Sequence, residues 1–176
     1  MSKPLVSIFM GSDSDLDQMK HCMNMLEFFR IPYEINIASA HRSPELVRKQ
    51  AGGLEKKGVR VIIAGAGGAA HLAGVLAAST ILPVIGVPMK TDTLSGLDSL
   101  YSIVQMPKGV PVAATAIGPS GAANAGVLAA QILALTNPGI KKNLLRYKKH
   151  LAAEIGRKAV RLKKVGYKEY LKQKEN

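Results

Sequence analysis

A histidine and an arginine stand side by side in the segment SAHRSP, residues 39–44. An imidazole can give or take a proton near neutral pH, and a guanidinium matches a phosphate group with two parallel hydrogen bonds. The serine and proline that close the segment are typical of a loop that leads into a helix. We predict that His41 acts as a general acid/base and that Arg42 binds phosphate, with Ser39 as a further residue of the same pocket.

The segment GSDSD, residues 11–15, combines hydroxyls and carboxylates at the start of another predicted helix. Serine and aspartate cap the free N–H groups of a first helical turn, and this structural role alone accounts for the residue types. Carboxylates repel phosphate but accept hydrogen bonds from hydroxyl groups, so the segment is alternatively predicted to hold the hydroxyls of a sugar. Both interpretations stay open on this pattern alone.

A third segment, AGAGGAAHLAG at residues 64–74, is nearly free of reactive side chains. Its glycines match the dinucleotide fingerprint G-x-G-x-x-A, but the acidic residue expected about 20 positions later is absent from the next apolar run, VIGVPMK. NAD is therefore disfavoured, while backbone amides around Gly67 that face an anion or a flat polar ligand remain possible. His71, at a helix start among alanines, is predicted to pack or hydrogen-bond rather than to move protons.

Several kinds of reactive site are missing from the sequence. No spacing of His, Cys, Asp and Glu matches a metal site, and neither the nucleophile motif G-x-S-x-G nor the ATP-binding motif G-x-x-x-x-G-K-[ST] occurs. We expect a reaction without metal, cofactor, covalent nucleophile or nucleotide hydrolysis.

Five short apolar segments alternate with helical patterns, which is typical of an α/β fold with a parallel sheet. The predicted strands are residues 5–10, 33–38, 59–64, 82–87 and 110–115. The predicted helices cover about residues 15–29, a stretch from residue 43, and residues 69–78, 95–105 and 120–135. Strand-to-helix loops of a parallel sheet emerge at one edge, so we expect the five loops 11–15, 39–44, 65–71, 88–96 and 117–124 to converge on one site.

Length and charge suggest one α/β domain at residues 1–140 and a basic amphipathic helical extension at residues 141–176. Thirteen basic and three acidic residues lie in the extension, so the first 140 residues carry only +2 of the net charge of +12. Helical spacing relates Leu144, Leu151, Ile155, Ala159 and Leu162. We expect this helix to dock on the body or on a neighbouring subunit. Nucleic-acid binding is disfavoured because no interleaved aromatic residues accompany the charge.

The remaining composition favours a cytoplasmic protein. Cys22 is the single cysteine, which excludes an internal disulfide, and no run approaches the roughly 20 apolar residues of a membrane span. The first residues lack the cleavage pattern of a secretory signal. A hydrophobic fraction of 47% suggests apolar surface hidden between subunits.

Four segments, MGSDSD, SAHRSP, AGAGGAAHL and LSGLDSLYSIVQMPKGVPV, together closely resemble the PurE family, the N5-carboxyaminoimidazole ribonucleotide mutases of purine synthesis. The resemblance covers about residues 6–135, and its most specific part is residues 94–107. It implies a three-layer flavodoxin-like fold with a five-stranded parallel sheet and a homo-octamer. It also implies a cofactor-free shift of a carboxylate from the exocyclic nitrogen to C4 of an imidazole ring.

By position, the resemblance makes His41 the general acid/base and makes Ser12, Asp15 and Arg42 the ribonucleotide-binding residues, with Arg42 on the phosphate. The implied reaction removes CO2 from nitrogen, holds it in a small dry pocket, adds it to C4 and removes the C4 proton. The small residues of the third segment are expected to form that pocket.

Two alternatives stay open beside the mutase. A related branch of the family carboxylates aminoimidazole ribonucleotide directly with CO2, but it replaces the Gly-Ala-Ala-His segment that this chain carries at residues 68–71. A non-catalytic flavodoxin-like module that binds FMN or phosphate would also account for the loops. The chain departs from the family in two ways: Ala73 replaces the usual proline, which is expected to soften that loop, and the basic extension is longer than usual.

Overall fold

The computed structural model describes residues 3–175 and contains a five-stranded parallel sheet. Its strand order is β2-β1-β3-β4-β5. Strand β2 therefore lies on one side of β1, and the later strands lie on the other. The strands are β1 (Val6–Met10), β2 (Tyr33–Ile37), β3 (Val61–Ala66), β4 (Val84–Pro88) and β5 (Ala113–Ala114). Strands β1, β3 and β4 are buried along their whole length, which explains why Ser7 of β1 is the one residue with a polar side chain among them.

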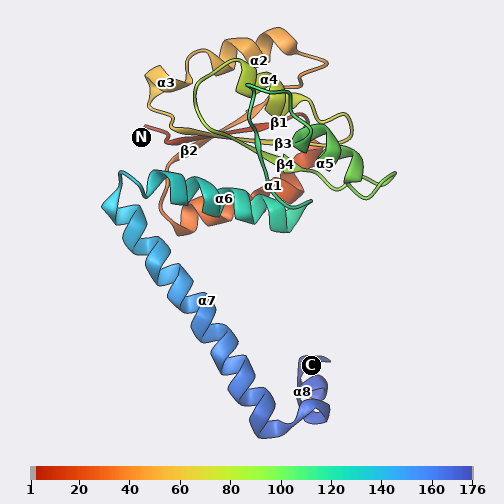
Figure 1. The fold of residues 1–176 in the computed structure, drawn as a ribbon, viewed down its shortest axis with the longest axis vertical. Helices are drawn as coiled ribbons and strands as arrows, with labels where there is room; N and C mark the ends of the chain where they lie inside the picture. Colours follow the sequence, from red (N-terminus) through yellow and green to blue (C-terminus); the bar gives the residue numbers. More distant parts are fainter. Residues whose placement is uncertain (1–2, 176) are drawn as a thin grey trace.

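Helices cover both faces of the sheet, giving the three layers that the sequence predicts (Figure 1). On one face lie α1 (Leu16–Phe28) and α6 (Pro119–Leu133). On the other lie α2 (Pro44–Ala51), α3 (Leu54–Lys57), α4 (Leu72–Ala78) and α5 (Leu97–Val104). Each face buries its own apolar cluster against the sheet.

Strand β5 is much shorter than the predicted stretch of residues 110–115. Only two of its residues pair with β4, Ala113 opposite Ile85 and Ala114 opposite Gly86. Pro111 lacks an amide hydrogen and cannot donate to a sheet ladder, so pairing begins after it.

Small residues let α6 lie directly against α1. A side-chain carbon at Gly126 would lie 2.8 Å from Cβ of Met25 and 2.9 Å from the Cys22 carbonyl oxygen. These distances are shorter than carbon contacts allow, so the two helices can approach this closely only because residue 126 is a glycine.

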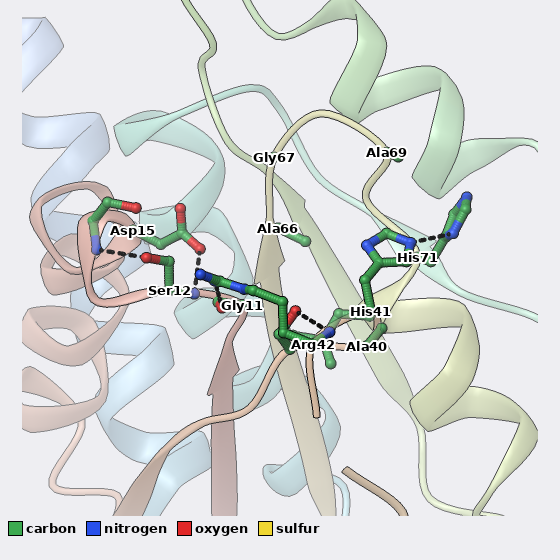
Figure 2. A pocket seen from close by; sticks show the side chains of 13 residues that line it. Gly11, Ser12, Asp15, Ala40, His41, Arg42, Ala66, Gly67, Ala69 and His71 are labelled. Carbon is green, nitrogen blue, oxygen red and sulfur yellow. Dashed lines mark hydrogen bonds between the residues drawn. The ribbon is translucent and has the colours of Figure 1, made fainter. Parts of the chain in front are cut away.

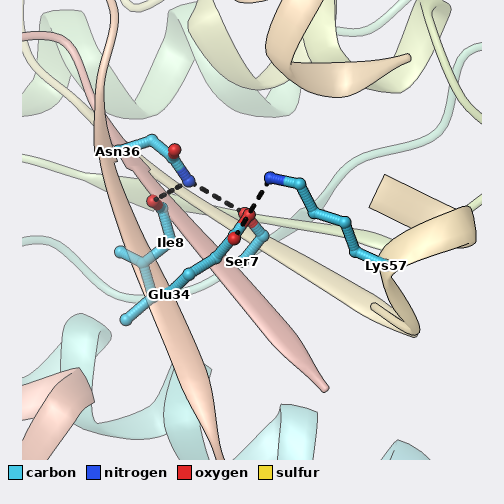
Figure 3. Close-up of polar contacts among 5 residues, drawn as sticks. All are labelled: Ser7, Ile8, Glu34, Asn36 and Lys57. Atoms are coloured by element: carbon cyan, nitrogen blue, oxygen red, sulfur yellow. Dashed lines mark hydrogen bonds and ion pairs between the residues drawn. The ribbon is translucent and has the colours of Figure 1, made fainter. Parts of the chain in front are cut away.

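A buried polar group joins the edge strand β2 to β1 and α3 (Figure 3). The Ser7 hydroxyl donates to Oε1 of Glu34 at 2.9 Å and accepts a hydrogen bond from Nδ2 of Asn36 at 3.0 Å. Lys57 forms an ion pair with the same glutamate at 3.3 Å. Because one hydroxyl bonds two side chains of β2, a slip of the strand by one residue would break both bonds.

The C-terminal extension consists of α7 (Pro138–Val165) and α8 (Tyr167–Glu175). Asn137 caps α7 by accepting hydrogen bonds from the amides of Gly139 and Ile140, and Ile140 and Leu144 are buried in the body. Beyond these turns α7 extends away from the sheet, and α8 lies beside its far end (Figure 1).

The predicted docking of the extension on the body therefore holds only for the first turns of α7. Leu144 is the buried member of the predicted apolar stripe, while Leu151, Ile155, Ala159 and Leu162 are exposed. The predicted start of the extension at residue 141 falls inside α7, because the Asn137-Pro138 cap starts the helix three residues earlier. Within residues 3–175, no helix is long and apolar enough to cross a membrane.

Candidate functional site

A cavity of about 420 Å3 opens at the carboxyl ends of β1, β2 and β3 (Figure 2). The loop after β1 contributes Gly11, Ser12, Ser14 and Asp15. The loop after β2 contributes Ser39, Ala40, His41 and Arg42, and β3 with its following loop contributes Ala66, Gly67, Ala69, His71 and Leu72. All seven residues predicted from the sequence for the pocket, namely Ser12, Asp15, Ser39, His41, Arg42, Gly67 and His71, thus lie around one cavity.

Only three of the five predicted loops line this cavity. Residues 88–96 and 117–124 lie further along the same edge, where the Gln18 side chain bonds the amide and the carbonyl of Lys90. The Gly118 amide likewise donates to the Pro88 carbonyl at 2.8 Å. The cavity forms where the strand order reverses around β1, so loops from β4 and β5 lie beyond its rim.

Ser12 and Asp15 cap a short helical turn and line the cavity at the same time. The Ser12 hydroxyl accepts a hydrogen bond from the Ser14 amide at 3.4 Å, and the Asp15 carboxylate accepts one from the Ser12 amide at 3.3 Å. Burial raises the pKa of the Asp15 carboxyl, although the amides of Ser12 and Gly11 and the charge of Arg42 act in the opposite direction. The capping interpretation is therefore confirmed, and it leaves oxygen atoms of both side chains at the cavity.

Arg42 lines the cavity and is bonded to the loop after β1. Its Nη2 donates to the Gly11 carbonyl at 2.8 Å, and its backbone amide donates to the Ser39 hydroxyl at 3.2 Å. The Ser39 amide in turn donates to the Ser43 hydroxyl at 3.0 Å. A guanidinium has five N–H donors, so an arginine braced in this way keeps donors available for an anion.

His41 and His71 are hydrogen-bonded to each other. Nε2 of His41 lies 2.8 Å from Nδ1 of His71, and the two rings meet edge to face with their centroids 4.8 Å apart. His71 thus forms a hydrogen bond, and its partner is the histidine predicted to move protons; that His71 itself moves no proton stays a prediction. Nδ1 of His41 has no hydrogen-bond partner within residues 3–175.

The glycine-rich loop differs from a dinucleotide-binding loop in two ways. Helix α4 begins at Leu72, after His71 at the N-cap, rather than at the predicted Ala69, and the loop before it turns at Gly68 with a left-handed φ of 65°. The Gly68 amide, which such a loop would present to an anion, instead donates to the hydroxyl of Ser99 at 3.0 Å. Ala73 is buried in the first turn of α4, a place that also tolerates proline, so the expected softening would concern a helix start and not a loop.

Sequence reasoning missed cavity residues whose side chains carry no obvious chemistry. The missed residues are Gly11, Ser14, Ala40, Ala66, Ala69 and Leu72. Each lies within two residues of a predicted one, so closeness in the sequence could have identified it as a cavity residue. Among residues 3–175, no three His, Cys, Asp or Glu side chains are grouped to hold a metal ion.

Comparisons with known proteins agree on one family. The sequence profile of a family described as AIR carboxylase matches residues 5–154. A Thermotoga maritima protein named N5-carboxyaminoimidazole ribonucleotide mutase is 58% identical over 172 residues, which cover 98% of this chain and 99% of that protein. That similarity extends into the C-terminal helices.

Two further relatives widen the comparison. A Candida glabrata protein named phosphoribosylaminoimidazole carboxylase is 51% identical over 98% of this chain but only 30% of its own length. The solved structure of Treponema denticola PurE has a TM-score of 0.80 at 30% identity, covering 93% of this chain and 99% of that one.

Proposed function

This chain belongs to the AIR carboxylase family, and we propose that it is an N5-carboxyaminoimidazole ribonucleotide mutase of de novo purine biosynthesis. It is an isomerase, because the reaction moves a carboxylate within one molecule from the exocyclic nitrogen to C4 of the imidazole ring. The observation that carries the proposal is the meeting of His41, Arg42, Ser12 and Asp15 around one cavity in a chain of this family.

Arg42 and the loop after β1 divide the recognition of the ribonucleotide between them. The Arg42 guanidinium, fixed by its bond to the Gly11 carbonyl, binds the phosphate. Ser12 and Asp15 take the ribose hydroxyls, since a carboxylate accepts hydrogen bonds from hydroxyls and repels phosphate. A volume of about 420 Å3 lies within the range of roughly 300–1,000 Å3 usual for small-molecule sites.

His41 supplies and recovers one proton during the reaction. Protonation of the exocyclic nitrogen accompanies cleavage of its bond to the carboxylate carbon, which leaves aminoimidazole ribonucleotide and CO2. C4 of the ring then attacks CO2, and His41 removes the C4 proton to restore the aromatic ring. The proton count closes, because the imidazole gives one proton on the first leg and regains one on the last.

The small residues beside His41 keep CO2 next to the ring. Ala40, Ala66, Gly67 and Ala69 line the cavity with little more than backbone and methyl groups, so the flat imidazole and a CO2 molecule fit against the wall. His71 holds His41 through the 2.8 Å hydrogen bond and thereby orients its ring.

The test is formation of the C4-carboxylated ribonucleotide from the N5-carboxylated one, with His41→Asn beside the wild type. We expect the variant to fold and to bind the ribonucleotide but to lose about 10²–10⁴-fold in kcat, the usual contribution of a general acid/base. His150→Asn, a histidine exposed on α7, is the matched control and should behave as wild type. Wild-type turnover in His41→Asn would refute the role of His41.

The Candida glabrata relative makes direct carboxylation of aminoimidazole ribonucleotide the second candidate. The two activities differ in what they consume: the mutase uses the N5-carboxylated ribonucleotide without added bicarbonate, whereas the carboxylase needs it. The Gly-Ala-Ala-His segment at residues 68–71 supports the mutase through its family resemblance.

The chain is further proposed to work in the cytoplasm as a homo-octamer. Two exposed apolar stripes support assembly into some oligomer: Leu97, Tyr101 and Val104 along α5 with Leu94 just before it, and Leu151, Ile155 and Leu162 along α7. Exposed apolar side chains that gather in stripes are typical of surfaces that contact another protein.

A further inference from the structure

The most family-specific run of the sequence, residues 94–107, stays outside the cavity, yet it contacts the cavity wall. It forms α5, whose Ser99 is fully buried. The Ser99 hydroxyl accepts the hydrogen bond of the Gly68 amide at 3.0 Å. One turn later, the Ser102 hydroxyl lies 3.2 Å from the Gly68 carbonyl oxygen and 2.8 Å from that of Asp98, so its single hydrogen serves these two acceptors.

Two serines of one helix therefore hold both backbone groups of Gly68. This residue has a left-handed φ of 65°, and open space surrounds the position of a missing side-chain carbon, so packing does not fix it in place. The hydrogen bonds from α5 are the contacts that define where the Gly68 peptide lies.

Gly68 is connected to the predicted reacting groups through its neighbours in the loop. Its neighbours Gly67 and Ala69 line the cavity. The Ala69 carbonyl accepts a hydrogen bond from the His71 amide at 2.8 Å, and His71 holds His41 at 2.8 Å. A continuous series of contacts thus leads from α5 to the histidine that moves protons.

The start of α5 is itself anchored. The Thr91 hydroxyl donates to the Asp98 carboxylate at 2.8 Å and accepts a hydrogen bond from the Gly96 amide at 3.1 Å. Gly96 takes a left-handed φ of 93°, and a side-chain carbon there would lie 2.5 Å from Ile117. Because the first turn of α5 is fixed in this way, Ser99 and Ser102 present their hydroxyls at defined positions.

We propose that Ser99 and Ser102 are positioning residues for the mutase reaction, which hold the Gly68 peptide so that the cavity wall stays closed on CO2 and His71 stays against His41. The inference rests on the proposed function and deepens it. Neither serine lines the cavity, so neither is expected to contribute to binding of the ribonucleotide.

Loss of the Ser99 hydroxyl leaves the Gly68 amide without its partner and frees the loop to move. CO2 released from nitrogen then escapes before C4 attacks it, and aminoimidazole ribonucleotide leaves as a side product. A substitution that weakened the fold alone would lower the amount of active protein without changing this partition, so the partition distinguishes positioning from stability.

The experiment follows N5-carboxyaminoimidazole ribonucleotide labelled in its carboxylate and measures labelled CO2 lost per C4-carboxylated product, with spontaneous loss subtracted. For Ser99→Ala we expect this ratio to rise and kcat to fall about tenfold, the effect of one buried hydrogen bond, with KM within about twofold of wild type. Ser79→Ala is the control for loss of a serine hydroxyl: like the Ser102 hydroxyl, that of Ser79 bonds a helical carbonyl, here of Val75, but it does not touch the loop. It should match the wild type.

Two further measurements make the outcome decisive. Ser102→Ala removes only a half-buried hydroxyl and should give a smaller rise in the same ratio, so it tests the proposal even where Ser99→Ala fails to fold. Exchange of the Gly68 amide hydrogen should accelerate in Ser99→Ala. Wild-type partition in folded variants of both serines would overturn the inference, whereas a wild-type enzyme that forms no C4-carboxylated product would overturn the proposed function instead.

Discussion

The hydrogen bond between the two histidines constrains how each can carry a proton. A neutral imidazole has one N–H and one acceptor nitrogen, so the 2.8 Å contact needs one ring to donate and the other to accept. The contact therefore couples the tautomers of the two rings, since the ring that donates fixes the other as acceptor, and it also holds the orientation of the His41 ring. In this arrangement Nδ1 of His41 is the ring nitrogen left free of His71, and we propose that it is the one that exchanges a proton with the substrate.

His71→Ala tests this positioning role. Without its partner, the His41 ring can rotate, and small errors in the position of a catalytic group are costly, so we expect kcat to fall roughly ten- to a hundredfold. The loss should be smaller than in His41→Asn, and KM should stay near the wild-type value because Arg42, Ser12 and Asp15 are untouched. Steady-state kinetics measure both parameters. An undiminished kcat would contradict the role, and a loss equal to that of His41→Asn would make His71 a proton carrier.

Asp15 predicts a dependence of stability on pH. Burial raises the pKa of this carboxyl above that of the unfolded chain, so the folded state keeps a proton that the unfolded state has lost. The resulting stabilisation is complete below the unfolded pKa and disappears as the pH rises through the folded pKa. Above its folded pKa, the folded protein holds a charged Asp15 carboxylate in a partly buried place.

Asp15→Asn removes that charge and keeps an amide oxygen for the Ser12 amide. We expect the variant to unfold at higher urea concentration than the wild type at neutral pH, and the difference to shrink as the pH falls towards about 4. Its KM should rise because the ribose hydroxyls lose a charged acceptor. Urea denaturation between about pH 4 and pH 8 measures this difference in stability between the variant and the wild type. A difference of the opposite sign, or one that does not change with pH, would contradict the argument.

Among the elements, α1 and α6 show how a sequence of small residues determines packing. Gly126→Ala places a methyl group against Met25 and the Cys22 carbonyl, so the helices must separate. We expect a loss of about 1–3 kcal/mol in the free energy of unfolding. Gly156→Ala is the matched control, because the glycine is helical and nothing lies within 4 Å of the added carbon. There the higher helix propensity of alanine should add up to about 1 kcal/mol. Equal effects of the two changes in urea denaturation would contradict the packing argument.

The elements also show what the sequence could predict. Continuous apolar runs mark strands that are buried on both faces, so β1, β3 and β4 could be located from hydrophobicity alone. Strand β5 could not, since only partner geometry shows that pairing starts after Pro111. The meeting of the first three loops follows from parallel topology. The last two loops do not line the cavity because of the strand order, which cannot be read from any local sequence pattern.

The hydrogen bonds of the site were beyond prediction for a similar reason. His41 and His71 are 30 residues apart, and Gly68 and Ser99 are 31 apart. Residue types can indicate that such side chains need partners. Which partner lies within 3 Å depends on the packing of α4 and α5 against the sheet.

At the scale of the whole molecule, charge and apolar surface are unevenly distributed. The first 140 residues carry a net charge of only +2, while the extension carries +10 and extends into solvent on α7. This helix has 28 residues and so is roughly 42 Å long, yet within residues 3–175 only its first turns are buried. A long helix of this kind gains most of its stability from packing of its apolar face, yet among residues 3–175 Leu151, Ile155 and Leu162 of that face stay exposed.

A second copy of the chain is the partner that the proposed oligomer supplies, and two aspartates on the stripe test it. Leu151 and Ile155 are one helical turn apart and are 39% and 65% exposed, so Leu151→Asp with Ile155→Asp should leave the subunit folded. In a contact between copies the same change buries two carboxylates, and we expect the mass in solution to fall below that of the wild-type oligomer.

The matched control is Ala153→Asp, which adds a carboxylate on the opposite side of the same helix, where the side chain is also exposed. It should keep the wild-type mass in light scattering coupled to gel filtration, and circular dichroism should show the same helix content in all three proteins. Kinetics on the same samples show whether assembly matters for turnover, since each subunit carries its own cavity. An unchanged mass in the double variant would exclude the stripe on α7 from the contact between copies and leave the stripe on α5 as the remaining candidate surface.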